Sequence, residues 1–150
     1  MRYFKFEDEV HQSLSCVPMT VRRKLDRVGV KISLEQWQAL GRGERLAICH
    51  LPVGEADECA ALRTFIEEAL QNRRAGRSKE LSEEMRRAAD PPAMPPAPLI
   101  ERARAAGVAL AQADWDRLDA DERYALIKLG GGKEVSHNLI AALHELVKQR

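Results

Sequence analysis

The side chains best suited to metal chemistry in this chain are its cysteines, Cys16, Cys49 and Cys59, together with His11 and His50. A structural zinc site needs four thiolate or imidazole ligands, usually arranged in close pairs. Cys49 and His50 form a close pair, but adjacent residues of a helix face different directions. We therefore predict no metal site and no cofactor, and we interpret the cysteines as small, buried apolar residues.

Catalytic and phosphate-binding patterns are weak. The run LGGGKE places Lys133 after three glycines but lacks the remaining positions of a P-loop, including the Ser or Thr after the lysine. Glu44 and Glu122 recur at matching places, yet both stand at expected helix starts, where a carboxylate is favoured by the helix dipole. We therefore predict that the protein is not an enzyme and has no catalytic residue.

One stretch of the chain is strongly basic and holds a single acid, Asp26. Its five bases are Arg22, Arg23, Lys24, Arg27 and Lys31. Because Val21, Leu25 and Val28 recur at helical spacing and take the inner face, we expect the bases to point outward. The stretch is interpreted either as a solvated helix face or as a docking patch for an acidic protein surface, which would act mainly on the rate of association.

Length and composition are those of one globular domain. The chain has 150 residues, of which 45% are hydrophobic and 31% charged. No apolar run approaches the roughly 18 residues that span a bilayer, and the first ten residues carry acids where a signal peptide is apolar. We expect a cytoplasmic protein without a membrane partner. The net charge of +1 opposes a nucleic-acid partner.

The chain matches itself when it is shifted by 78 positions. Val21–Leu51 then aligns with Leu99–Leu129 without a gap, and eight of 31 positions are identical, where chance would give roughly two. Trp37 and Trp115 fall on the same position. We predict an internal duplication, because so many identities, including both tryptophans, recur in register.

The predicted fold class is all-α. A single domain of residues 1–150 would contain two tandem repeats with pseudo-two-fold character, one at about 18–52 and one at about 98–130. Residues 90–98 form a proline-rich linker, expected as polyproline II. The residues predicted to form the structural core of the repeats are Leu25, Gly29, Trp37, Leu40, Gly107, Trp115 and Leu118.

Each repeat is expected to run as helix, glycine stop, short extended piece and two helices. Gly29 and Gly107 fit the left-handed position that follows a helix end. The extended pieces, residues 30–32 and 108–110, could pair as a small ladder between the halves. A charged, exposed helix is expected at residues 78–89.

Four short motifs lie in the first forty residues: FKFE at 4–7, SLSCVPM at 13–19, VRRKLDRVG at 21–29 and WQAL at 37–40. The second half adds ALIKL at 125–129 and a His-Asn before the last helix. Together they resemble the conserved nitrate reductase-associated protein family. The resemblance covers nearly the whole chain and is loose between about Pro52 and Pro98.

The resemblance implies a bacterial accessory protein whose genes tend to lie near those for assimilatory nitrate reductase and molybdopterin synthesis. It implies that the protein helps this molybdenum enzyme to mature or stay active, and it implies no catalytic residue. Its partner would be the reductase or its cofactor-insertion machinery, docked at the five bases. One alternative is a ligand or metal carrier that handles the molybdenum cofactor; a second is a nucleic-acid-binding regulator built on the consecutive short helices.

Overall fold

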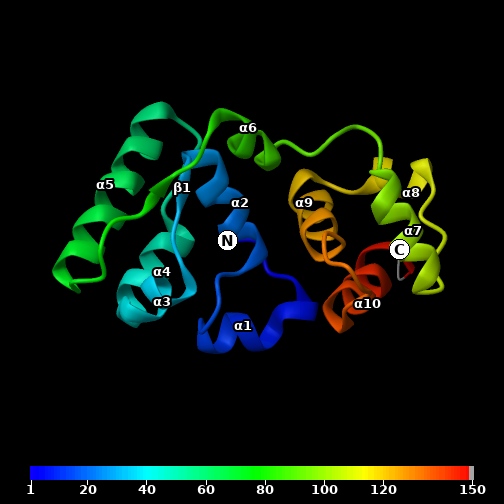
Figure 1. The fold of residues 1–150 in the computed structure, drawn as a ribbon, viewed down its shortest axis with the longest axis horizontal. Helices are drawn as coiled ribbons and strands as arrows, with labels where there is room; N and C mark the ends of the chain where they lie inside the picture. Colours follow the sequence, from blue (N-terminus) through cyan, green and yellow to red (C-terminus); the bar gives the residue numbers. More distant parts are fainter. Residues whose placement is uncertain (149–150) are drawn as a thin grey trace. The chain divides into compact units, whose positions relative to one another are not determined.

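The computed structural model describes residues 1–148, which are mostly helical and include a two-stranded sheet (Figure 1). The predicted all-α class is confirmed. The contacts divide the chain into two compact units: unit 1 holds residues 1–3 and 8–89, and unit 2 holds residues 4–7 and the chain from Asp90 onward. That the whole chain forms a single domain stays a prediction.

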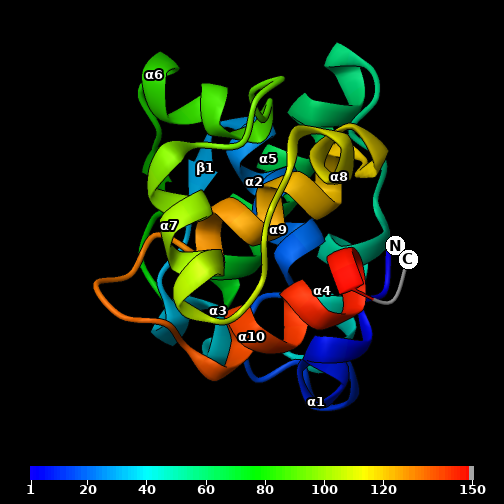
Figure 2. The same ribbon diagram turned by 90° about the vertical axis from the view of Figure 1, so that its right-hand side faces the viewer.

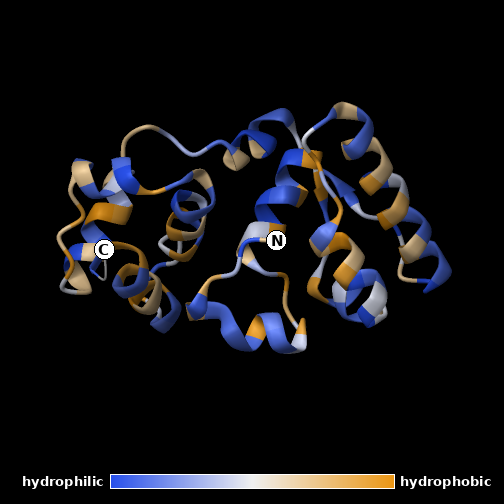
Figure 3. Ribbon diagram, turned by 180° about the vertical axis from the view of Figure 1, so that it is seen from behind, coloured by the Kyte–Doolittle hydropathy of each residue, from blue (hydrophilic) through white to orange (hydrophobic). Residues whose placement is uncertain are grey.

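Unit 1 is a set of short helices around one apolar core. Its elements are α1 (Asp8–Ser13), α2 (Met19–Val28), β1 (Val30–Lys31), α3 (Leu34–Ala39), α4 (Arg42–His50), α5 (Ala56–Asn72), β2 (Lys79–Glu80), α6 (Glu83–Arg86) and a 3-10 turn, η2 (Arg87–Ala89). The amphipathic pattern of α5 is visible in Figure 3, and its apolar side buries Leu62, Ile66 and Leu70. The helix expected over residues 78–89 begins instead as a strand.

Trp37 lies at the centre of unit 1 with an exposed fraction of 0%. Its indole N–H donates to the backbone carbonyl of Leu14 at 2.8 Å, so the buried polar atom is satisfied. Leu25 and Leu40 are buried in the same cluster. The core therefore ties α2 and α3 to the segment that precedes α2.

Unit 2 contains a second set of helices, with α7, α9 and α10 turned toward the viewer in Figure 2. Its elements are a 3-10 turn, η1 (Lys5–Glu7), then α7 (Ala97–Ala105), α8 (Gln112–Arg117), α9 (Ala120–Leu129), α10 (His137–Leu143) and a π-helical turn, η3 (His144–Lys148). The Glu145 carboxylate accepts the backbone N–H groups of Lys5 and Phe6, at 3.2 and 2.9 Å. Trp115 and Leu118 are buried.

The elements of the two units correspond when 78 is added to each residue number of unit 1. The bounds of α3 then coincide with those of α8, and α2 and α4 match α7 and α9 to within one residue. The indole N–H of Trp115 donates to the carbonyl of Pro92 at 3.0 Å, and Pro92 is also 78 positions after Leu14. These matches are what a duplication requires, and the common origin of the units stays a prediction.

Gly29 and Gly107 both adopt the left-handed conformation, with φ of +86° and +80°. Gly29 is the C-cap of α2, and Gly107 follows the C-cap of α7; each turns the chain into an extended piece. A side chain at either position would be strained, because L-residues rarely adopt this backbone region.

The predicted pairing of residues 30–32 with residues 108–110 is wrong. β1 pairs antiparallel with β2, so that Lys31 lies opposite Lys79. The backbone N–H of Leu81 extends this contact by donating to the carbonyl of Gly29 at 2.9 Å. A segment of the same unit, returning after α5, thus satisfies the edge of β1.

Replacing Trp37 by alanine should lower the free energy of unfolding by about 3–5 kcal/mol, because it empties a fully buried site. Trp37→Phe, which keeps a six-membered aromatic ring but loses the pyrrole part of the indole with its N–H, should cost less. Chemical denaturation followed by circular dichroism measures both. An unchanged free energy in Trp37→Ala would contradict the central role of this ring.

Candidate functional site: a basic face on unit 1

The five bases singled out in the sequence do not share one environment. Arg22, Arg27 and Lys31 are exposed, whereas Arg23 and Lys24 are half-buried. The Nε of Arg23 donates to the carbonyl of Ala89 at 2.7 Å and so joins α2 to η2. Periodicity placed all five on the outer side of the helix, but the two half-buried bases reach backbone carbonyls of neighbouring elements.

Lys24 completes the end of α4. Its Nζ donates to the carbonyl of Ile48 at 2.5 Å. Four residues after Ile48 stands Pro52, which has no N–H to continue the helix. At the equivalent place in unit 2, the carbonyl of Leu126 accepts the N–H of Gly130 at 2.8 Å. Lys24 thus supplies the donor that proline removes.

Burial shapes the electrostatics around Lys24 and Cys49. Burial lowers the pKa of Lys24, an effect that the neighbouring Cys49 partly opposes. Burial also raises the pKa of the Cys49 thiol, although the Lys24 ammonium and the terminal amine of Met1 act in the other direction. At neutral pH Cys49 is therefore a buried thiol.

The interpretation of all three cysteines as buried residues holds for Cys49 but is wrong for Cys16, which is exposed. Cys59 is intermediate, and its thiol donates to the carbonyl of Val53 at 3.3 Å. Cys16 lies in the irregular segment between α1 and α2, two residues after Leu14, which has a positive φ; the residue type alone did not predict its exposure.

Two bases that the sequence did not single out join the exposed ones on unit 1. Lys79 lies directly opposite Lys31 across the sheet. Arg86 packs against Gly29, where an added Cβ would lie 2.9 Å from its Nε, and its Nη2 donates to the carbonyl of Arg27 at 3.4 Å. We call the exposed side chains Arg27, Lys31, Lys79 and Arg86 the basic face.

The basic face contains an unfavourable pair. Two lysines directly opposite each other across an antiparallel ladder repel and destabilise the sheet. The neighbouring acid, Glu80, lies 3.7 Å from Arg63, so it is directed to another base. No local sequence signal marks this pairing, because Lys-Glu has poor strand propensity. An acidic partner would relieve the repulsion between the lysines.

Residues 1–148 contain neither a metal-binding cluster nor a membrane-spanning helix. No group of three His, Cys, Asp or Glu side chains in this range is placed to hold a metal ion. Every helix of this range is too short or too polar to cross a bilayer.

These observations define a helical protein made of two tryptophan-centred units, one of which carries a basic face. Residues 3–146 match the family model described as conserved nitrate reductase-associated protein, and the chain belongs to that family. No match was found among curated proteins, and none among solved structures.

Replacing Lys24 by methionine should destabilise the protein by about 1–3 kcal/mol, because the buried carbonyl of Ile48 loses its donor. The loss should be smaller in a Pro52→Ala background, where α4 can extend by one residue as α9 does. Chemical denaturation of the four variants of this cycle measures the coupling.

Lys133→Met is the matched control for this cycle, since Lys133 is exposed and lies outside the sheet. It should change the free energy of unfolding by no more than about 0.5 kcal/mol. Equal stability of Lys24→Met and Lys133→Met would contradict a capping role for Lys24.

Proposed function

We propose that this chain is a non-enzymatic accessory protein of the bacterial cytoplasm that binds nitrate reductase or the proteins that insert its molybdenum cofactor. The observation that carries the proposal is the family match over residues 3–146, whose description associates these proteins with nitrate reductase. Binding would help the reductase to mature or to stay active.

The basic face is the surface that we propose for docking. It gathers bases from α2, β1, β2 and α6 and contains the repelling pair of Lys31 and Lys79. An acidic surface on the partner would neutralise that pair and speed association by electrostatic steering. Arg22 is exposed on α2 and can contribute, whereas Arg23 and Lys24 serve the fold.

A second candidate function is the binding of an anionic ligand such as the cofactor itself. A cavity beside the basic face is lined by two arginines, Arg63 and Arg86, with Thr64, Cys59 and Val28 among its other walls. The guanidinium groups and the hydroxyl would suit a phosphate. Ligand binding that is lost in Arg63→Ala, with the reductase contact intact, would favour this candidate.

Reversing the lysine pair tests the docking proposal. Lys31→Glu with Lys79→Glu keeps two like charges opposite each other, so the stability of the sheet should change little. The double variant should bind purified nitrate reductase, or its cofactor-insertion proteins, about tenfold more weakly, mainly through slower association. Biolayer interferometry at two salt concentrations measures both rates.

The control is the double variant Arg77→Glu with Lys133→Glu, which makes the same change in net charge at exposed positions outside the basic face. It should bind like the unmodified protein. Unchanged binding by the lysine-pair variant would overturn the basic face as the docking site. Absence of binding by the unmodified protein would overturn the proposed function.

A further inference from the structure

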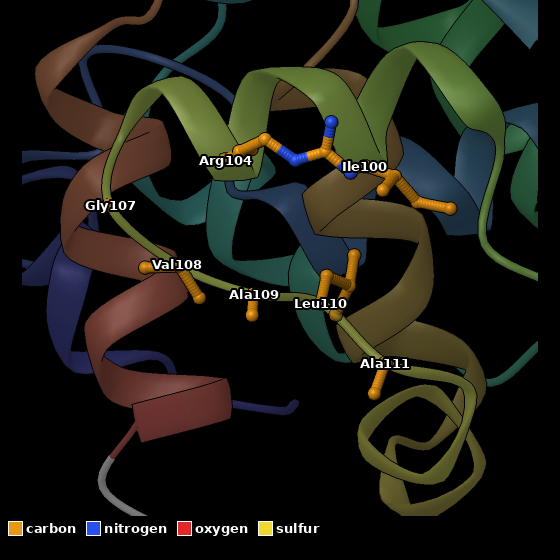
Figure 4. A pocket seen from close by; sticks show the side chains of 7 residues that line it. All are labelled: Ile100, Arg104, Gly107, Val108, Ala109, Leu110 and Ala111. Carbon is orange, nitrogen blue, oxygen red and sulfur yellow. The ribbon is translucent and has the colours of Figure 1, made fainter.

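Unit 2 carries a shallow groove beside α7, at the place where the chain leaves that helix (Figure 4). Ile100 and Arg104 line it from α7, and residues 107–111 line it from the extended piece that follows. The groove is apolar apart from Arg104 and the backbone groups of the extended piece.

The extended piece has the geometry of an unpaired edge strand. Val108 and Leu110 are buried while Ala109 between them is exposed, which is the alternation of a strand. Within residues 1–148, the N–H of Ala109 has no protein acceptor and the carbonyl of Gly107 no protein donor. Such groups form a template for pairing with another chain.

In unit 1 the corresponding edge is paired with a strand of the same unit. Gly29 and Lys31 of unit 1 correspond to Gly107 and Ala109 of unit 2. In unit 1 the N–H of Leu81 donates to the carbonyl of Gly29, Lys79 lies opposite Lys31, and the Leu81 side chain is 8% exposed. A short extended segment with one apolar anchor thus completes the edge.

We propose that the groove of unit 2 binds an extended acidic segment of a partner protein as an added antiparallel strand. The N–H of an apolar anchor residue donates to the carbonyl of Gly107, as that of Leu81 does to Gly29. The segment accepts the N–H of Ala109 two residues away, and the anchor side chain occupies the apolar part of the groove.

Charge defines the chemistry of this occupant. Arg104 is the charged side chain that lines the groove, whereas the equivalent position of unit 1 is Asp26. In unit 1 the paired segment places Lys79 opposite Lys31, so the charge of the occupant of unit 2 follows from Arg104 alone. That occupant carries a carboxylate that meets the guanidinium group of Arg104. This site is distinct from the basic face, and the proposal does not depend on that face.

A synthetic peptide tests the proposal directly. The probe is a fluorescent peptide with the sequence of residues 77–83 of this chain and the substitution Lys79→Glu. It should bind the full-length protein and slow hydrogen exchange of the Ala109 amide. A second peptide, with N-methyl-leucine in place of the leucine, keeps the side chain but lacks the donor to Gly107, and it should bind about fivefold more weakly.

Protein variants separate the contribution of charge to peptide binding from the contribution of the backbone hydrogen bonds. Arg104→Glu should weaken binding of the probe about fivefold, whereas Lys133→Glu, exposed elsewhere in unit 2, should leave it unchanged. The proposal is overturned by absence of binding at about 1 mM peptide, by equal binding of the N-methylated peptide, or by an unaffected Arg104→Glu variant. Protection of unit 1 amides in place of Ala109 also overturns it.

Failure of this test would leave the proposed function untouched, because binding of the reductase is measured separately at the basic face. In the same way, loss of the reductase interaction in the lysine-pair variant would say nothing against a peptide bound beside Arg104. The two outcomes are therefore distinguishable.

Discussion

The structure depends on two buried indole N–H groups, each of which must find an acceptor inside an apolar core. Trp37 and Trp115 are both fully buried, and each donates to the carbonyl of a residue 23 positions earlier, Leu14 or Pro92. An unpaired indole would cost the desolvation of its N–H. The bond therefore fixes the segment before α2 or α7. Helix α2 contributes Arg27 to the basic face, and α7 contributes Ile100 and Arg104 to the groove.

The two units satisfy equivalent backbone groups with different residues. Where Pro52 ends α4 early, Lys24 supplies a donor from α2, whereas Gly130 of unit 2 supplies its own N–H. At the glycine that follows α2, Arg86 packs against Gly29, while an added Cβ on Gly107, which follows α7, would meet nothing within 4 Å. Helix order is thus shared, and the surfaces proposed for binding differ because the flanking segments differ.

The sequence was sufficient for features that depend on local chemistry. Ser33 and Asp119 each have a Gln or Glu three residues later, the spacing of a capping box, and both boxes form. Gly29 and Gly107 adopt the expected left-handed conformation. Tertiary features were missed. Helical periodicity predicts that Lys24 is exposed like its basic neighbours. Its capping role depends on the carbonyl of Ile48, 24 residues away, which lacks a backbone donor. β2 was missed because Lys-Glu has no preference for a strand.

Because β2 has poor strand propensity, contacts of its flanking residues must hold it in place. Two residue pairs, one of them a repelling pair of lysines, contribute little stability. The segment is retained by its flanks: Leu81 is buried, Arg86 packs on Gly29, and the carbonyl of Ala89 accepts from Arg23. Backbone pairing thus sets direction and register, while anchors outside the pair supply the free energy. A segment bound to the edge of unit 2 must therefore bring an anchor of its own, since two added hydrogen bonds would not hold it.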